Sequence, residues 1–135
     1  MSTFKPEKLK QKRLQIDFDA NPAGAGDHAI FEASGDLEIQ SVVVYAHTAI
    51  GGGYTDLTMQ SNHSSAFVII KSGGSGLPAA LTQQKQVQYN STKWVLKSGQ
   101  RINLTPVGGT VSGGLMEVVI DYIPISGGQL LTTYP

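Results

Sequence analysis

The sequence predicts an all-β domain, an antiparallel β-sandwich preceded by an extended N-terminal arm. Sixteen glycines and six prolines divide the 135 residues into short runs. Many of these runs alternate apolar and polar residues with period two, as half-buried strands do. They recur at roughly 8–12-residue spacing, which is typical of a sandwich or barrel. A chain of this length fits one domain with one core.

The first strand and the last are the clearest. Leu14, Ile16 and Phe18 alternate with polar residues and therefore share one face. The last strand is rich in β-branched residues and is closed by Pro124. Eight or nine short strands are expected within the ranges 13–18, 28–33, 36–48, 54–60, 65–71, 86–89, 93–97, 101–105 and 115–123.

The third strand is expected to alternate without a break. Leu37, Ile39, Val43 and Tyr45 occupy every second position around a β-branched run at 42–44. Turns are expected where glycine and asparagine gather, and glycines at 108–109 and 113–114 bracket an expected hairpin tip. The other turn or loop segments are 51–53, 73–76, 90–91 and 98–99.

Charge divides the chain into a basic arm and an acidic body. The formal net charge is zero. Residues 1–13 hold five basic side chains against Glu7 alone, a net charge of +4, which leaves five basic and nine acidic side chains, a net charge of −4, in the remainder. We therefore divide the chain into a basic N-terminal arm (1–13), a β-sandwich domain (14–125) and a C-terminal tail (126–135).

The arm is expected to be extended or weakly helical and to be ordered mainly by a partner, because so short a segment does not hold a helix alone. Its charges and apolar side chains are candidate partner-binding residues: Phe4, Lys5, Lys8, Leu9, Lys10, Lys12 and Arg13. An acidic protein surface suits this arm better than nucleic acid does. The acidic body would repel phosphates, and the scattered aromatics predict no stacking platform for bases.

Candidate chemistry is sparse. Cysteine is absent, which excludes disulfides and thiolate chemistry. His28, His47 and His63 show no metal-ligand spacing, no GxSxG motif occurs, and the glycine-rich loops lack the phosphate-binding pattern. Paired acids such as Asp17 and Asp19 fit the solvated side of a strand. We expect neither an enzyme nor a cofactor or metal site.

Two further predictions concern where the protein is made and whether Trp94 binds a ligand. No apolar stretch reaches the roughly 18 residues that a membrane span needs, and the N-terminus lacks the apolar region of a signal peptide. We therefore expect synthesis in the cytoplasm and no contact with a membrane. Trp94 is the single tryptophan. It is a candidate ligand-binding or interface aromatic, with a core position as the alternative.

A resemblance to a known group of proteins narrows the possible functions. The segment Lys93-Trp-Val-Leu-Lys-Ser-Gly-Gln-Arg-Ile-Asn-Leu continues through the glycine pairs at 108–114 into Leu-Met-Glu-Val-Val-Ile-Asp-Tyr-Ile at 115–123. It resembles the closing strands of small tailed-phage virion proteins built on a jelly roll. Residues 41–71 are similar in rhythm to the front half of that fold.

The resemblance implies a jelly-roll-like sandwich and a capsid decoration (cement) protein on the outer surface of a phage head. It also implies the major capsid protein as partner, a homotrimer, and anchoring through the N-terminal arm. Two alternatives stay open. One is the carbohydrate- or receptor-binding tip domain of a phage fibre, acting through Trp94 or tyrosines. The other, disfavoured by the missing metal ligands, is a cupin-like enzyme domain.

Overall fold

The computed structural model describes residues 8–61, 68–71, 85–90, 94–125 and 127–135, and these residues form strands and connections with no helix. The all-β prediction is confirmed. The strands are β1 (Lys10–Asp17), β2 (His28–Ala33), β3 (Leu37–Ala46), β4 (Gly51–Gly52), β5 (Asp56–Ser61), β6 (Val68–Lys71), β7 (Lys85–Asn90), β8 (Trp94–Leu96), β9 (Arg101–Val107), β10 (Val111–Gly113), β11 (Leu115–Pro124) and β12 (Leu130–Thr132).

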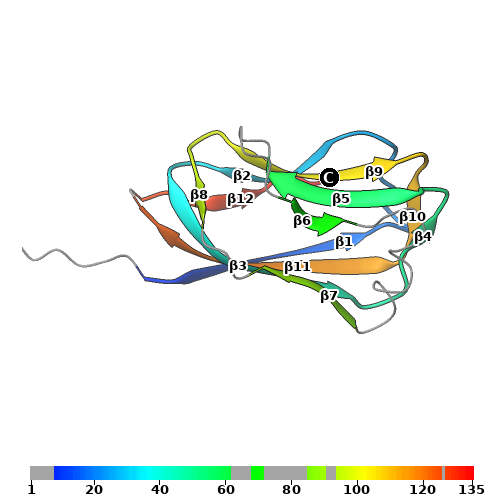
Figure 1. Ribbon diagram of the computed structural model, residues 1–135, viewed down its shortest axis with the longest axis horizontal. Helices are drawn as coiled ribbons and strands as arrows, with labels where there is room; N and C mark the ends of the chain where they lie inside the picture. The colour runs from blue at the N-terminus through cyan, green and yellow to red at the C-terminus, as the bar shows by residue number, and fades with distance from the viewer. Residues whose placement is uncertain (1–7, 62–67, 72–84, 91–93, 126) are drawn as a thin grey trace, which may run out of the picture.

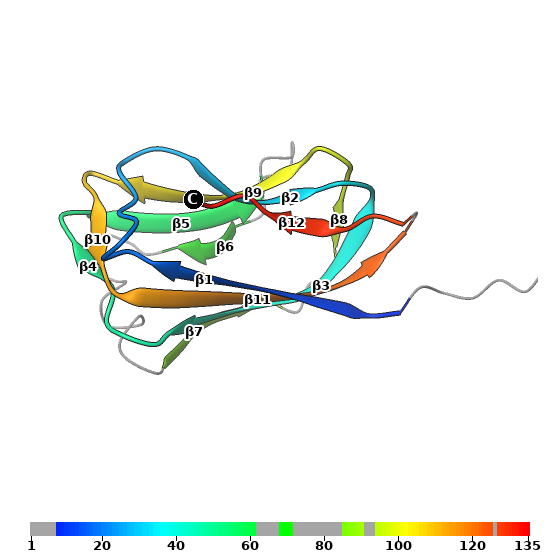
Figure 2. The same ribbon diagram turned by 180° about the vertical axis from the view of Figure 1, so that it is seen from behind.

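Two antiparallel sheets form the layers of a sandwich (Figures 1 and 2). The first sheet has the order β1-β11-β3-β7, and β8 also pairs with β3. The second sheet has the order β12-β2-β9-β5-β6, and β10 and β4 form a small separate ribbon. Most strands adjacent in sequence thus alternate between layers, except β5 and β6, which pair in the second sheet, and β7 and β8, which both pair with β3. The four-strand cores β1-β11-β3-β7 and β2-β9-β5-β6 have the order of a jelly roll.

The core fills the space between the two sheets. Ile16 on β1 and Phe18, the residue that follows β1, are 2% and 0% exposed, as the alternation predicted. Facing them from the second sheet are fully buried residues: Ile30, Leu57, Met59, Ile102 and Leu104. Alternate residues of both sheets therefore meet inside, and the residues between them are left for the outer faces.

A bulge in β3 interrupts its alternation. Ile39 pairs with Tyr122 and Ser41 pairs with Asp121, so that Gln40 is one extra residue on the β3 side. An extra residue shifts the side-chain phase by one, and every later side chain then points to the opposite face.

The expectation of one unbroken alternation through Leu37, Ile39, Val43 and Tyr45 is therefore wrong. Leu37 and Ile39 are buried, whereas Val43 and Tyr45 lie on the outer face of the first sheet and are partly exposed. After the bulge, the core side of β3 is formed by Val42, Val44 and Ala46. Sequence periodicity cannot locate such a bulge, because a β-branched run is compatible with either phase.

Two other expectations need correction. The segment bracketed by 108–109 and 113–114 is not a hairpin tip, because its strand β10 pairs with β4. The expected turn at 90–91 lies partly outside the described residues, and β7 and β8, on either side of it, do not pair with each other. Both pair antiparallel with β3, one after the other along the same strand. The segment 126–135 carries a further strand, β12, which pairs with β2.

β1 also begins earlier than the alternation predicted. Its pairing with β11 runs without a register shift from Lys10 opposite Tyr122 to Asp17 opposite Leu115. Lys10, Lys12 and Arg13, which the sequence placed in the arm, therefore belong to the sheet. Residues 10–12 are polar and give no apolar alternation, so the sequence pattern did not predict that they belong to the strand. The backbone pairs with β11 regardless of side-chain hydropathy. Among the described residues, no helix is long and apolar enough to cross a membrane.

The C-terminal strand closes the sandwich. Leu130 is 1% exposed, and the Tyr134 hydroxyl donates to the Asn21 carbonyl at 2.9 Å. Truncation after Gln129 should lower the free energy of unfolding by about 2–4 kcal/mol, because it removes one buried leucine and at least one hydrogen bond. Urea denaturation measures this. Leu131→Ser, at a position 41% exposed, is the control and should change stability by less than about 0.5 kcal/mol. An unchanged midpoint after truncation would show that 130–135 is an incidental tail.

Candidate functional site

The outer face of the first sheet carries a connected group of polar side chains. β11 lies at its centre, paired with β1 on one side and β3 on the other. Three rows of paired residues cross this face from β1 through β11 to β3: Gln15–Glu117–Tyr45, Arg13–Val119–Val43 and Gln11–Asp121–Ser41. The bulge in β3 is what brings Val43 and Tyr45 into these rows.

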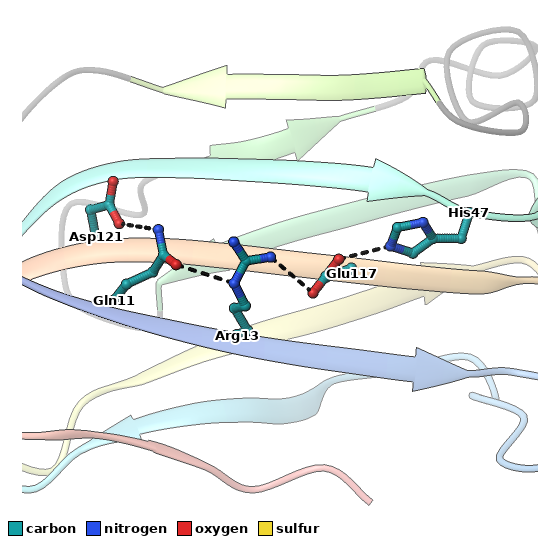
Figure 3. Close-up of polar contacts among 5 residues, drawn as sticks. All are labelled: Gln11, Arg13, His47, Glu117 and Asp121. Atoms are coloured by element: carbon teal, nitrogen blue, oxygen red, sulfur yellow. Dashed lines mark hydrogen bonds and ion pairs between the residues drawn. The ribbon is translucent and has the colours of Figure 1, made fainter.

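A chain of polar contacts joins five side chains on this face (Figure 3). Gln11 Nε2 donates to Asp121 Oδ1 at 3.0 Å, and Arg13 Nε donates to Gln11 Oε1 at 3.1 Å. Arg13 Nη1 lies 3.3 Å from Glu117 Oε2, and His47 Nε2 lies 2.7 Å from Glu117 Oε1. The contacts cross from β1 to β11 and on to the residue that follows β3, and they hold the side chains flat against the sheet.

Glu117 is the centre of this chain. Its side chain is 11% exposed, and each carboxylate oxygen has a cationic or imidazole partner. The hydrogen bond with His47 lowers the pKa of Glu117, and Arg13 lowers it further, against the opposing effect of burial. A carboxylate with a lowered pKa and two occupied oxygens is a poor general base. The arrangement therefore suits recognition better than proton transfer.

The same residues line a shallow depression of about 360 Å³. Val119, 7% exposed, lies beneath the polar side chains, and the rings of Tyr45 and His47 stack with centroids 6.4 Å apart. The residues that line it are Gln11, Arg13, Val43, Tyr45, His47, Glu117, Val119 and Asp121. Within the described residues, no group of three or more histidine and acidic side chains could hold a metal ion. The depression offers donors, acceptors and an aromatic ring to a partner.

Exposed apolar side chains lie at the end of this sheet where β1 begins. Ile123 pairs with Glu38, which pairs with Val95, and Val95 is 41% exposed. Leu9, just before β1, is 58% exposed, and Ile125, just after β11, is 53% exposed. The surface therefore changes from polar to apolar toward the point where the N-terminal residues join the sheet.

The structure separates the predicted arm residues into two groups. Lys10, Lys12 and Arg13 lie on β1, and Lys8 and Leu9 precede it and are exposed. Phe4 and Lys5 lie outside the described residues, as do the loop at 73–76 and His63. Of the predicted residues, Arg13 alone takes part in the polar chain of Figure 3.

Trp94 is the other predicted site residue. It begins β8, pairs with Ile39 and is half-buried against the hydrophobic core. Its ring thus packs in part against the core and is in part exposed, and its role as a ligand-binding or interface aromatic stays a prediction.

Sequence analysis missed His47, Glu117 and Asp121. A signal was present, because Glu117 and Asp121 are the only charged residues within the apolar last strand and are four residues apart, which places them on one face. The partners could not be found in this way, since His47 and Gln11 are distant in sequence and their approach depends on the sheet order.

Comparison with known proteins shows which fold the chain has but does not show its family. No family model matches the sequence, and no curated protein is similar to it. A chain in the acidic stable capsid structure of Helicobacter pylori bacteriophage KHP30 has a similar structure, with a TM-score of 0.59 and 9% sequence identity over 94% of this chain and 95% of that one. This likeness shows a shared fold.

Two further structures are less similar. The nucleoplasmin-like N-terminal domain of Drosophila FKBP39 matches 93% of this chain and 100% of its own, with 9% identity and a TM-score of 0.42. A structure of Bacillus endospore appendages, a family of disulfide-linked pili, matches 93% of this chain and 98% of its own, with 12% identity and a TM-score of 0.39. Both scores are too low to add to the argument.

The polar chain makes stability depend on pH. Because the pKa of Glu117 is lowered on folding, its contribution is present above the ordinary glutamate range and is lost as pH falls through the folded-state pKa. Glu117→Gln should cost about 1–3 kcal/mol at neutral pH, and it should reduce the loss of stability that the wild type shows on acidification. Chemical denaturation between about pH 7 and pH 3 measures both effects.

A second glutamate provides the control. Glu32 pairs with Arg101 at 2.9 Å on the other sheet, with its side chain 34% exposed. Glu32→Gln should cost at most about 1 kcal/mol at neutral pH, because exposed ion pairs contribute little. Suppose that Glu117→Gln lowers the free energy of unfolding no more than Glu32→Gln does and leaves its pH dependence unchanged. The polar chain then contributes nothing measurable to stability.

Proposed function

We propose that this chain is a structural protein of a virion, a decoration protein that binds the outer surface of a phage head and stabilises the shell. The observation that carries the proposal is the near end-to-end structural match to a chain from a phage capsid structure, over 94% and 95% of the two chains. The matched chain has nearly the same extent, so the likeness covers a whole domain of that capsid structure and not a fragment.

The charge layout supports attachment to an acidic surface. Lys10, Lys12 and Arg13 lie on β1 and Lys8 comes just before it, whereas residues 14–135 have a net charge of −4. Exposed ion pairs contribute only about 0.2–1 kcal/mol each. Apolar contact must therefore supply the affinity, and the exposed Leu9, Val95 and Ile125 lie at the end of the sheet where β1 begins. We assign this end of the sheet and the N-terminal residues to the major capsid protein.

Self-association is part of the proposal. We propose a homotrimer in which subunits approach through the uncharged, glycine-rich ribbon of β4 and β10, where Gly51, Gly52 and Gly113 carry no side chain. Small residues permit close approach of backbones. Many copies bound over a symmetric shell would stabilise it through the sum of many weak contacts, without any chemical reaction.

The first test is binding to undecorated shells. A variant lacking residues 1–9 keeps all of β1 and should fold, and it should bind shells at least about tenfold more weakly than the full chain, because it loses Leu9 and several charges. Co-sedimentation with shells measures this. Circular dichroism and a thermal melt confirm folding. Equal binding by the two proteins would place the capsid contact elsewhere on the sandwich.

The second test separates steering from burial. Replacing Lys5, Lys8, Lys10 and Lys12 by glutamine should slow association at low salt and change little at high salt, because charges steer the encounter. Surface plasmon resonance on immobilised shells measures the rate. Leu9→Ser is the matched variant and should instead speed dissociation at both salt concentrations. A lysine variant that loses binding equally at all salt concentrations would contradict the steering role.

A further inference from the structure

One edge of β1 is unpaired in the described part of the chain. β1 is the first strand of its sheet and, among the described strands, pairs with β11 alone. The terminal strands of the two sheets otherwise include β12 with 3 residues, β6 with 4 and β7 with 6, and the pairings of β6 and β7 contain register shifts. β1 has 8 residues in unbroken register, without proline or glycine. Long, regular edges are the ones that accept another strand.

Two hydrogen bonds reveal which backbone groups of β1 are free. Phe18 N donates to Gly114 O at 2.9 Å, and His47 N donates to Leu115 O at 2.8 Å. Gly114 therefore faces β1, and Leu115 faces β3. Hydrogen-bonded and non-bonded pairs alternate along an antiparallel ladder, so the even-numbered residues of β1 bond to β11.

The odd-numbered residues consequently direct their N–H and C=O groups away from the sheet. These residues are Gln11, Arg13 and Gln15, since the Asp17 carbonyl already accepts from Asn21 N at 2.8 Å. Within the described part of the chain, no residue forms a hydrogen bond to the backbone of these three. Unpaired backbone groups in a regular row are the template for strand addition.

The polar chain on the outer face keeps this edge clear. The side chains of Gln11 and Arg13 are drawn across β11 toward Asp121 and Glu117 (Figure 3). Side chains held flat on the face do not fold over the edge, and their freedom is already reduced before a partner arrives. Preorganisation of this kind lowers the entropic cost of binding.

Charge indicates the partner. Lys10 and Lys12 lie two residues apart and thus on the same face, followed on that face by the buried apolar Leu14 and Ile16. Two copies joined edge to edge through β1 would bring two sets of these lysines together, and lysine at an edge discourages self-pairing. An antiparallel strand with carboxylates at two alternate positions, preceded by apolar residues, has complementary charge and hydropathy.

We propose that the free edge of β1 binds an extended acidic segment of another protein as an added antiparallel strand. Under the proposed function, that protein is the capsid subunit, and the inference rests on the proposed function only for this identity. The added strand would pair with the N–H and C=O groups of Gln11, Arg13 and Gln15 and place its carboxylates beside Lys10 and Lys12.

The test uses the full chain and a synthetic peptide, acetyl-Val-Thr-Val-Thr-Glu-Thr-Glu-amide, with its glutamates replaced by lysine in the control peptide. We expect the acidic peptide to slow exchange of the Gln11, Arg13 and Gln15 amide protons, measured by NMR, and the lysine peptide to have no effect. Gln15→Pro removes one outward N–H without breaking the ladder to β11. It should weaken peptide binding at least about tenfold. Gln15→Thr keeps that N–H and should bind within about twofold of wild type.

Each other outcome overturns the inference. One is protection at residues outside β1, and another is equal binding by the Gln15→Pro and Gln15→Thr variants. A third is protection of the same three amides without peptide as protein concentration rises, which would assign the edge to a second copy. Shell binding separates the two proposals. If Gln15→Pro binds shells normally, strand addition fails and decoration stands. If the acidic peptide protects the edge but the full wild-type chain does not bind shells, decoration fails and strand addition stands.

Discussion

The pairing of β11 with β1 on one side and β3 on the other is the constraint on which the rest of the structure depends. β11 supplies core residues on its inner face and Glu117, Val119 and Asp121 on its outer face. Because the last long strand must enter the sheet between the first and the third, the fold requires chain segments 98 to 112 residues apart to meet. The outer-face contacts between β1 and β11 therefore form only once the sandwich is closed.

Most of the fold could be predicted from local patterns. The strand at 28–33 has the predicted bounds, and Leu14, Ile16 and Phe18 face the core as expected, because apolar alternation reports burial directly. The prediction failed where the apolar pattern along the chain does not report which residues are buried or paired. The bulge at Gln40 changes phase inside a uniformly β-branched run, and the start of β1 at Lys10 is polar on both faces.

The candidate site was less accessible to sequence analysis for a different reason. Arg13 was singled out for its charge in a basic arm, yet its position is fixed by Glu117, 104 residues away. Glu117 and Asp121 show a local signal, namely acids in an apolar strand, but the identity of their partners depends on sheet order. Spacing along the chain carries no information about a contact that strand order creates.

The position of the C-terminal strand has a practical consequence. β1 belongs to one layer of the sandwich, whereas β12 and the Tyr134 side chain, which bonds to Asn21 and stacks edge-on against His28, belong to the other side of the molecule (Figure 2). If the β1 layer faces a shell, a protein fused after Pro135 is carried on the layer turned outward. Under the proposed function, the geometry that separates the two sheets would make this small domain a one-sided adaptor for displaying cargo on a particle surface.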